Sequence, residues 1–510
     1  MNIGNLLVRN AFDNADKEAV IFEDKRFTYK EFNNRVNRFA NALLGMGYKK
    51  GDIIANWLGN CNEFMEVYYA IAKIGAIMFP VNPMLAPKDI LYLLQWSDSQ
   101  LLIFGEAFKD QAKSFRSELP GISKYIYVGE KKLTPPDTLN YESLLEKNGD
   151  KEPSIEVLED DNLIFLSTGG TTGLPKLVVL SHKAAIWISV DMLIDVGYRG
   201  DDITLNSMPL FHGACLGIWF NPHMYLGATQ VIMKGFNPEE YLKLIDREKV
   251  TSLFFMPPVL HSRLIQVPGY EKYDVNSIRI LYTAGAAFPQ KIRDQIQSHM
   301  KNARIHYIYG LSEMGPNGSV LKPKDAGSRL GSCGRLVASV EWKIVDDQDN
   351  ELPRGQVGEL LLRGPSMMKE YYKRPEETKA GLKNGWVHTG DLLKADREGW
   401  LYFVDRKKDM IKSGGENVYA KTVEDCLYTH PDIADVAVIG VPDEQWGEAV
   451  KAIVVLRKGA ETVKEKDIID FCKKNLARFA VPKSIDFVSD LPRNPSGKVL
   501  KPELRKIYVK

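Results

Sequence analysis

Short apolar runs alternate with amphipathic stretches through the first half of the chain. Residues 29–46 carry apolar side chains at spacings of three and four, which predicts a helix. Residues 53–57 form a mainly apolar run after a Gly-Asp pair, which predicts a buried strand. Residues 73–94 predict the end of a helix, a short strand, a turn and a second helix. This β–α alternation indicates parallel sheets covered by helices.

The middle of the chain continues this alternation and then departs from it. Apolar runs predict strands at residues 229–233, 252–255, 278–283 and 304–309. From residue 322 to 364 the pattern changes to short strands, at 340–345 and 358–363, joined by turns rich in Asp, Asn and Gly. That pattern favours a small β-barrel or meander.

The last hundred or so residues form a third pattern, preceded by a charged run at 406–409. Helices are predicted at 418–428 and 465–476, and strands at 433–439 and 452–456. The fold class that we predict is therefore α/β, with two β–α layered subdomains and a small β-barrel in a large N-terminal domain. The predicted boundaries are 1–405 for that domain, 406–408 for a linker and 409–510 for a small α+β domain.

Composition and charge exclude several classes of function. The 510 residues include 44% hydrophobic and 26% charged residues, as in soluble globular proteins, and the net charge is only +1. That charge gives no electrostatic reason to expect a nucleic-acid partner. The five cysteines are scattered without metal-ligand spacing, which favours reduced thiols in the cytoplasm. We find no signal peptide or membrane-spanning run, and expect a soluble chain of enzyme size in the cytoplasm, either monomer or homodimer.

The stretch 163–182, LIFLSTGGTTGLPKLVVLSH, predicts a strand, a glycine-rich loop and a second strand. Backbone N–H groups, hydroxyls and a lysine in such a loop can hold phosphates. The spacing is not that of the NTPase P-loop, because two residues separate the last glycine from the lysine. A strand-connecting turn with a solvated lysine is the alternative. The candidate phosphate-binding residues are Thr168, Gly169, Gly170, Thr171, Thr172, Gly173 and Lys176.

Six further motifs follow the loop along the chain. They are YTAGAAFP (282–289), YGLSEMG (309–315), HTGD (388–391), DRKKDMIKSGGENV (405–418), DEQWGE (443–448) and PRNPSGKVLK (492–501). In this order and spacing they resemble the acyl- and aryl-CoA synthetase branch of the adenylate-forming superfamily. Two positions of the loop depart from the family pattern, with Gly169 where serine is common and Leu177 where glycine is common.

The resemblance implies an AMP-forming carboxylic acid–CoA ligase that uses ATP, Mg²⁺ and coenzyme A. The acid is first joined to AMP, and coenzyme A then takes the acyl group from the adenylate. A fatty acid of medium or long chain is the expected substrate, and an aryl acid is the alternative. Two other readings stay open: delivery of the acyl group to a carrier-protein thiol, and a nucleotide-binding relative without catalytic activity.

The resemblance also implies roles for single residues in the first reaction. Glu313 would bind magnesium, Ser312 would lie near the α-phosphate and Lys498 would be the catalytic lysine. Tyr309 would stack on adenine, although core packing is the alternative. Asp391 and Arg406 would hold the ribose. The remaining nucleotide-binding candidates are Gly285, Ala286, Ala287 and Gly310.

Rotation of a mobile C-terminal domain about one hinge residue would then bring in coenzyme A, and that residue falls on Lys408. The implied coenzyme A contacts are Gly414, Gly415, Trp446, Arg478 and Lys483, although Arg478 and Lys483 could equally be ordinary surface cations.

The segment PLFHGACLGIWF (209–220) resembles the part of the family that lines the acyl site. His212 would wall that site, and a buried, hydrogen-bonded core histidine is the alternative. The lining candidates carry no charged side chain, which favours an apolar acid over an amino acid. They are Gly213, Ala214, Phe254, Phe255, Thr283, Met314 and Gly315.

Overall fold

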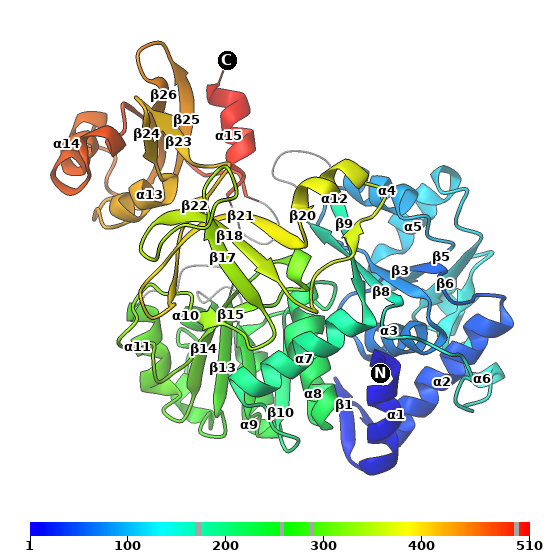
Figure 1. The fold of residues 1–510 in the computed structure, drawn as a ribbon. Coiled ribbons are helices and arrows are strands. Elements are labelled where there is room, and N and C mark those ends of the chain that lie inside the picture. The colour runs from blue at the N-terminus through cyan, green and yellow to red at the C-terminus, as the bar shows by residue number, and fades with distance from the viewer. Residues whose placement is uncertain (169–174, 256–259, 285–289, 494–498, 510) are drawn as a thin grey trace. The chain divides into compact units, whose positions relative to one another are not determined.

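The structure is a computed structural model of the whole chain. It describes all residues except 169–174, 256–259, 285–289, 494–498 and 510 (Figure 1). The described chain forms two compact units. The first unit contains Met1–Thr168, Pro175–Trp342 and Leu362–Val387, and the second contains Lys343–Leu361 and His388–Lys510.

The first unit contains a nine-stranded sheet in the order β16-β15-β14-β13-β12-β10-β11-β1-β2. The central strands, from β14 to β1, are parallel, and β2 and β15 are antiparallel to their neighbours. The strands are β1 (Glu18–Phe22), β2 (Lys25–Thr28), β10 (Ile203–Asn206), β11 (Thr229–Ile232), β12 (Ser252–Phe255), β13 (Ile280–Ala284), β14 (Arg304–Gly310), β15 (Gly318–Leu321) and β16 (Arg335–Leu336).

An eight-stranded sheet in the order β19-β9-β8-β4-β3-β5-β6-β7 completes this unit. Strands β8 to β7 in that order are parallel, whereas β9 and β19 are antiparallel to their neighbours. The strands are β3 (Ile53–Trp57), β4 (Ile77–Pro80), β5 (Leu101–Gly105), β6 (Lys124–Val128), β7 (Leu139–Asn140), β8 (Asn162–Thr168), β9 (Lys176–Ser181) and β19 (Glu370–Tyr371).

Helices cover both sheets (Figure 1). Helix α3 contacts β1 of the first sheet and both β3 and β4 of the second, and all thirteen of its residues are buried. A helix enclosed on all sides must be apolar around its whole circumference, as this one largely is. The helices of the unit are α1 (Ile3–Asp13), α2 (Tyr29–Gly45), α3 (Asn62–Ile74), α4 (Pro87–Trp96), α5 (Lys109–Phe115), α6 (Tyr141–Lys147), α7 (His182–Val196), α8 (Asn221–Leu226), α9 (Pro238–Glu248), α10 (Leu260–Leu264), α11 (Gln290–His299) and α12 (Pro375–Gly381).

The region predicted as a barrel or meander forms a five-stranded sheet, in which β22 joins the path β17-β18-β21-β20 by pairing with β21. Its strands are β17 (Glu341–Val345), β18 (Val357–Arg363), β20 (Leu382–Lys383), β21 (Trp386–Ala395) and β22 (Leu401–Arg406). Most of these residues belong to the second unit.

The rest of the second unit is a five-stranded sheet, β24-β23-β26-β25 with β27 beside β26, and three helices. Valine, isoleucine and alanine side chains of β25 and β26 pack with α13, α14 and α15. The elements are α13 (Ala420–Tyr428), α14 (Glu465–Asn475), α15 (Lys501–Tyr508), β23 (Ile411–Ser413), β24 (Glu416–Val418), β25 (Ile433–Asp443), β26 (Gly447–Leu456) and β27 (Ser484–Phe487).

The predicted mixed α/β fold class is confirmed, with a large N-terminal part and a small α+β C-terminal part. The domain boundary at 405–409 stays a prediction, because the compact second unit also takes in strands that precede it. No helix among the described residues combines the length and apolar content needed to cross a bilayer.

Candidate active site

The hairpin β8–β9 sets the two ends of the glycine-rich loop. Thr168, the last residue of β8, is the cross-strand partner of Lys176, the first residue of β9. Antiparallel pairing therefore fixes the loop's two ends opposite each other, in the strand–loop–strand arrangement that the sequence predicts. The predicted phosphate-binding residues Gly169, Gly170, Thr171, Thr172 and Gly173 lie outside the described residues.

Glu313 sits in a tight turn that follows β14. The 3₁₀ turn Ser312–Met314 ends at Gly315, whose φ of +65° favours glycine. Strand β14 ends at Gly310, which pairs with Gly318 of β15, and a Cβ at either position would collide with backbone atoms of the facing segment. These glycines let the chain turn back closely enough to present Glu313 and Ser312 at the strand's carboxyl end, where both are half-buried.

Tyr371 connects the two parts of this candidate phosphate site. Strand β19 pairs with β9, with Tyr371 opposite Val178. The Tyr371 hydroxyl donates a 2.7 Å hydrogen bond to Oε1 of Glu313, and the Lys176 ammonium lies 4.8 Å from the centre of the Tyr371 ring. Burial raises the pKa of this tyrosine, so it remains a donor at neutral pH. Lys176, Tyr371 and Glu313 thus form a cation–aromatic–carboxylate row.

Sequence reasoning missed Tyr371. Its only signal is alternation within the segment Lys369–Tyr372, which puts Tyr371 on the face opposite Glu370 and Tyr372.

The Glu313 carboxylate suits a magnesium ion that is carried mainly by a nucleotide. Among the described residues its Oε1 accepts the tyrosine hydroxyl and its Oε2 accepts no hydrogen bond. Magnesium is commonly held by one or two carboxylates, with phosphates and waters completing the octahedron. The described residues contain no cluster of three or more acidic, histidine or cysteine side chains able to hold a metal alone. The donor set at Glu313 therefore fits Mg²⁺ with a bound triphosphate.

The two candidate ribose ligands lie side by side in the second unit. Asp391 of β21 and Arg406 of β22 are cross-strand partners, with 3.8 Å between Oδ1 and Nε. Asp391 lies inside β21 and not in a turn, so the alternative of a simple turn acid does not hold. The strand before it is held by the buried Glu359, which accepts the Gly390 N–H at 3.0 Å and pairs with the Lys407 ammonium at 3.0 Å. Sequence reasoning missed Glu359, since a single acid inside a strand carries no recognisable spacing.

Four of the five candidate coenzyme A residues form one cluster. Gly414 and Gly415, with φ of +61° and +86°, make the two-residue turn between β23 and β24. The Gly414 N–H donates to the Trp446 carbonyl at 2.8 Å, and a Cβ on Gly414 would lie 2.7 Å from the Trp446 ring. The Lys483 ammonium lies 5.1 Å from the centre of that ring, which is 38% exposed.

Arg478, the fifth candidate, is exposed in the 3₁₀ turn Arg478–Ala480, which contacts β24.

The candidate acyl segment packs against the strand that leads into the glycine-rich loop. His212 is exposed, so the alternative of a buried core histidine does not hold, and its Nδ1 accepts the Ala214 N–H at 3.2 Å. A Cβ on Gly213 would lie 2.5 Å from the Leu166 side chain of β8. Ala214 is buried and begins the turn that leads into a π-helical segment, Cys215–Phe220. The peptide from 212 to 214 therefore lies near β8.

Phe254 lies in a buried aromatic group rather than at an open surface. Its ring stacks on Trp219 with 5.5 Å between centroids and meets Tyr282 edge-on at the same distance. Thr283 lies on the neighbouring strand β13, opposite residue 255 of β12. It is fully buried, and its hydroxyl has no hydrogen-bond partner among the described residues. Met314 is fully buried too, and Gly315 packs against Ile188.

Of the other candidates, Tyr309 is half-buried near the end of β14, where it pairs with Ser319. Lys498, Gly285, Ala286 and Ala287 lie outside the described residues, as does the side chain of Phe255.

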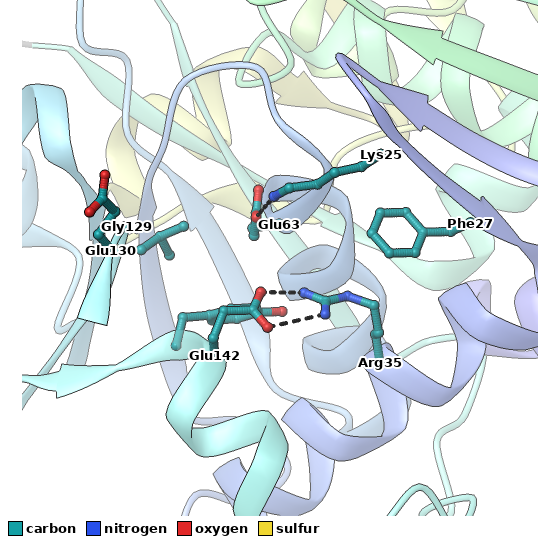
Figure 2. A pocket seen from close by; sticks show the side chains of 9 residues that line it. Lys25, Phe27, Arg35, Glu63, Gly129, Glu130 and Glu142 are labelled. Atoms are coloured by element: carbon teal, nitrogen blue, oxygen red, sulfur yellow. Dashed lines mark hydrogen bonds and ion pairs between the residues drawn. The ribbon is translucent and has the colours of Figure 1, made fainter. Parts of the chain in front are cut away.

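A separate cavity of about 430 Å³ contains none of these candidates. Arg35 of α2 extends across it to Glu142 of α6, and Lys25 faces Glu63 of α3 (Figure 2). Arg35 also pairs with the fully buried Glu66 at 2.8 Å, and Lys25 with Glu63 at 2.8 Å. Because each cation already has a carboxylate partner, this network ties helices together and does not present a free charge to a ligand.

Comparisons with known families and curated proteins identify the family of this chain. The model of the AMP-binding enzyme family matches residues 7–372, and that of the AMP-binding enzyme C-terminal domain matches residues 422–498. The long-chain-fatty-acid–CoA ligase FadD13 of Mycobacterium tuberculosis is 35% identical over 99% of this chain and 98% of its own length. The indoleacetate–CoA ligase of Aromatoleum aromaticum is 32% identical, covering 100% of this chain and 99% of that protein.

Solved structures give the same result. The anthranilate CoA ligase AuaEII, in complex with anthranoyl-AMP, superposes with a TM-score of 0.88 at 26% identity, covering 100% of this chain and 97% of that one. A Mycobacterium tuberculosis fatty acyl CoA synthetase superposes with a TM-score of 0.82 at 32% identity, covering 99% and 98%. The chain therefore belongs to the AMP-binding enzyme family, within its AMP-forming acid–CoA ligases.

Proposed function

We propose that the protein joins an apolar carboxylic acid, preferably a fatty acid of medium or long chain, to coenzyme A by way of an acyl-adenylate. The observation that carries the adenylation step is the row of Lys176, Tyr371 and Glu313 beside the ends of the glycine-rich loop. It offers a cation for a phosphate and a positioned carboxylate for a phosphate-bound metal where the edge of the eight-stranded sheet meets the turn after β14 of the nine-stranded sheet.

In the first step a carboxylate oxygen of the acid attacks the α-phosphorus of ATP, and the bond to pyrophosphate breaks. Magnesium, when bound, neutralises charge on the phosphates. Lys176 and the Thr168 hydroxyl would hold the phosphates that leave, and Tyr371 would keep Glu313 oriented toward the metal. Asp391 and Arg406 would hold the ribose, and Lys498 would offset the charge that gathers at phosphorus.

In the second step the sulfur of coenzyme A attacks the adenylate carbonyl, the thiol proton is lost and AMP departs. The cluster of Gly414, Trp446 and Lys483 supports this choice of acceptor. Its exposed indole and nearby ammonium suit an elongated chain that ends in phosphates. A rotation about Lys408 would exchange Lys498 for this cluster at the adenylate.

The candidate acyl residues favour an apolar acid. Those that the structure describes are glycine, alanine, methionine, phenylalanine and a buried threonine, together with the exposed His212, and none is a lysine, arginine or aspartate. An aryl acid is the second candidate, because the group of Trp219, Phe254 and Tyr282 offers flat aromatic faces. The relatives include enzymes named for both kinds of acid.

A panel of fatty, aryl and branched acids tests the proposal. Release of AMP and pyrophosphate is measured with and without coenzyme A, and acyl-CoA is detected directly. We expect an acid-dependent release of pyrophosphate and, with coenzyme A, a thioester. Adenylate formation with no thioester would show that the acceptor is another thiol, such as that of a carrier protein. No pyrophosphate release with any acid would favour a non-catalytic relative.

We also propose that the enzyme acts in the cytoplasm on small molecules, as monomer or homodimer, without a nucleic-acid partner. Its net charge of +1 and scattered cysteines support this.

A further inference from the structure

The predicted hinge residue lies between two anchored neighbours. On its N-terminal side, the Lys407 ammonium binds Glu359 at 3.0 Å and Asp347 at 2.9 Å, and the Lys407 N–H donates to Gly390 at 2.8 Å. Glu359 and Gly390 belong to β18 and β21, and Asp347 lies in the turn that follows β17. Residue 407 is therefore fixed to the part of the chain that precedes the hinge.

On the C-terminal side, helix α15 holds the next residue. The Arg505 guanidinium binds Asp409 at 3.0 Å and also reaches the Lys408 carbonyl at 3.4 Å. Residue 409 is thus fixed to the small α+β domain. With anchors on both neighbours, the backbone dihedrals of Lys408 are the natural place for a rotation, which agrees with the hinge implied by the sequence.

The side chain of Asp405 spans this pivot, and so do the backbone hydrogen bonds that the Arg406 carbonyl accepts from the N–H groups of Asp409 at 2.9 Å and Met410 at 3.1 Å. Asp405, the residue before Arg406 in β22, is only 3% exposed. Its Oδ1 accepts the Arg406 N–H at 2.8 Å, and its Oδ2 accepts the Lys421 N–H at 3.3 Å. Lys421 is in the first turn of α13, beyond the pivot, and β22 and α13 contact each other (Figure 1).

Helix α13 lacks a cap of its own. The residue at its N-cap position, Tyr419, makes no side-chain capping bond. The free N–H groups of a first turn need acceptors, and a carboxylate there also meets the positive end of the helix dipole. Asp405 supplies that carboxylate from the other side of the pivot.

A half-buried cation supports the same contact. The Lys501 ammonium at the start of α15 pairs with the half-buried carboxylate of Glu424 in α13 at 2.9 Å. Burial raises the pKa of both Asp405 and Glu424, and Lys501 opposes that rise at each of them. Lys501 therefore acts on both acids. Because Lys501 and Glu424 both lie beyond the pivot, a movement of α13 away from β22 would separate Asp405 from this cation as well as from the Lys421 N–H.

We propose that Asp405 is a positioning residue that caps α13 across the Lys408 pivot and so stabilises the present domain orientation over the one reached by rotation. The inference rests on the proposed two-step function, in which each half-reaction uses one orientation. Loss of the cap would favour the rotated orientation by about fivefold, the factor that one helix cap typically corresponds to. The rates of the two half-reactions would then change in opposite directions.

The test compares Asp405→Ala with Asp467→Ala. Asp467 is a matched control, because its carboxylate caps α14 through the Lys464 N–H at 3.0 Å with both partners beyond the pivot. For each variant, acid-dependent ATP–pyrophosphate exchange reports the first half-reaction. Thioester formation from supplied acyl-adenylate and coenzyme A reports the second. Hydrogen exchange of the first-turn amides of α13 reports the cap itself.

We expect Asp405→Ala to change the ratio of the adenylation rate to the thioester-forming rate about fivefold. It should also speed hydrogen exchange of the Lys421 amide, whereas Asp467→Ala should do neither. Asp405→Asn keeps an acceptor oxygen and should restore most of the amide protection. A ratio that stays within twofold of wild type, or an equal shift in Asp467→Ala, would overturn the proposal. If the wild-type protein shows no acid-dependent ATP–pyrophosphate exchange, the proposed function fails instead. Hydrogen exchange of the Lys421 amide alone then decides whether Asp405 caps α13.

Discussion

The hydroxyl of Tyr371 offers the sharpest test of the candidate phosphate site. In Tyr371→Phe the ring stays, and with it the contact to the Lys176 ammonium, but the 2.7 Å hydrogen bond to Glu313 is lost. A hydrogen bond to a charged group contributes about 1.5–3 kcal/mol. If about 1.4–2 kcal/mol of that free energy serves to orient Glu313 toward the metal in the transition state, the rate falls about tenfold to thirtyfold.

The assay is acid-dependent ATP–pyrophosphate exchange at several magnesium concentrations. We expect kcat/KM for MgATP to fall by that factor and the magnesium concentration for half-maximal rate to rise. The melting temperature should fall by no more than about 2–4 °C, because a single half-buried hydrogen bond is lost from a large unit. Thioester formation from supplied acyl-adenylate should be nearly unchanged, since no pyrophosphate is held in that step.

Tyr372→Phe is the matched control. This neighbouring tyrosine donates a 2.8 Å hydrogen bond to another carboxylate, that of Asp98. Its loss removes the same kind of bond from the same short segment, but away from Glu313 and Lys176. An equal loss of exchange activity in the two variants would show that the effect is structural. Full activity in Tyr371→Phe would refute the orienting role outright.

Three further predictions concern the other groups. Lys498→Ala should lower pyrophosphate exchange about 10²–10³-fold and leave thioester formation from supplied adenylate within about twofold; equal losses would contradict separate conformations. Gly414→Ala places a Cβ 2.7 Å from Trp446 at a residue with a φ of +61°. It should raise KM for coenzyme A about tenfold without affecting pyrophosphate exchange, and an unchanged KM would contradict a role of this cluster in binding coenzyme A. Burial lowers the pKa of His182 and His306 to about 4, so both are neutral when folded and take up protons on unfolding below pH 6.5. Stability should therefore fall as pH drops from about 6.5 to 4, by about 3 kcal/mol per histidine, and each His→Gln variant should lose part of that dependence in pH-resolved denaturation.

Strands with strong local patterns could be predicted closely from the sequence. The strands at 53–57 and 252–255 match β3 and β12 at both ends, because each is an apolar run closed by turn residues. The strand pair around the glycine-rich loop was also predicted. In these cases the residues that determine the element lie within the element.

Features that depend on distant pairing could not be predicted. Strand β19 has two residues, too few for any periodicity, yet its pairing with β9 places Tyr371 against Glu313. The hairpin β1–β2 joins the larger sheet through β11, about two hundred residues later. Asp405 shows the same limit, since its role as a cap depends on where α13 packs. The local sequence shows which chemical group is present, but its contacts depend on which distant segments pack against it.

The candidate phosphate cluster and the candidate coenzyme A cluster each lie within a single unit. This matters because the adenylate made in the first half-reaction is the substrate of the second. The row of Lys176, Tyr371 and Glu313 is held by β9, β19 and β14, all of the first unit. The cluster of Gly414, Trp446 and Lys483 is held by β23, β26 and the segment before β27, all of the second. A rotation about Lys408 would then change which groups meet the substrate without rebuilding either cluster. For the same reason Tyr371→Phe and Gly414→Ala should each impair one half-reaction and spare the other, and a variant that impaired both equally would show that the clusters are not independent.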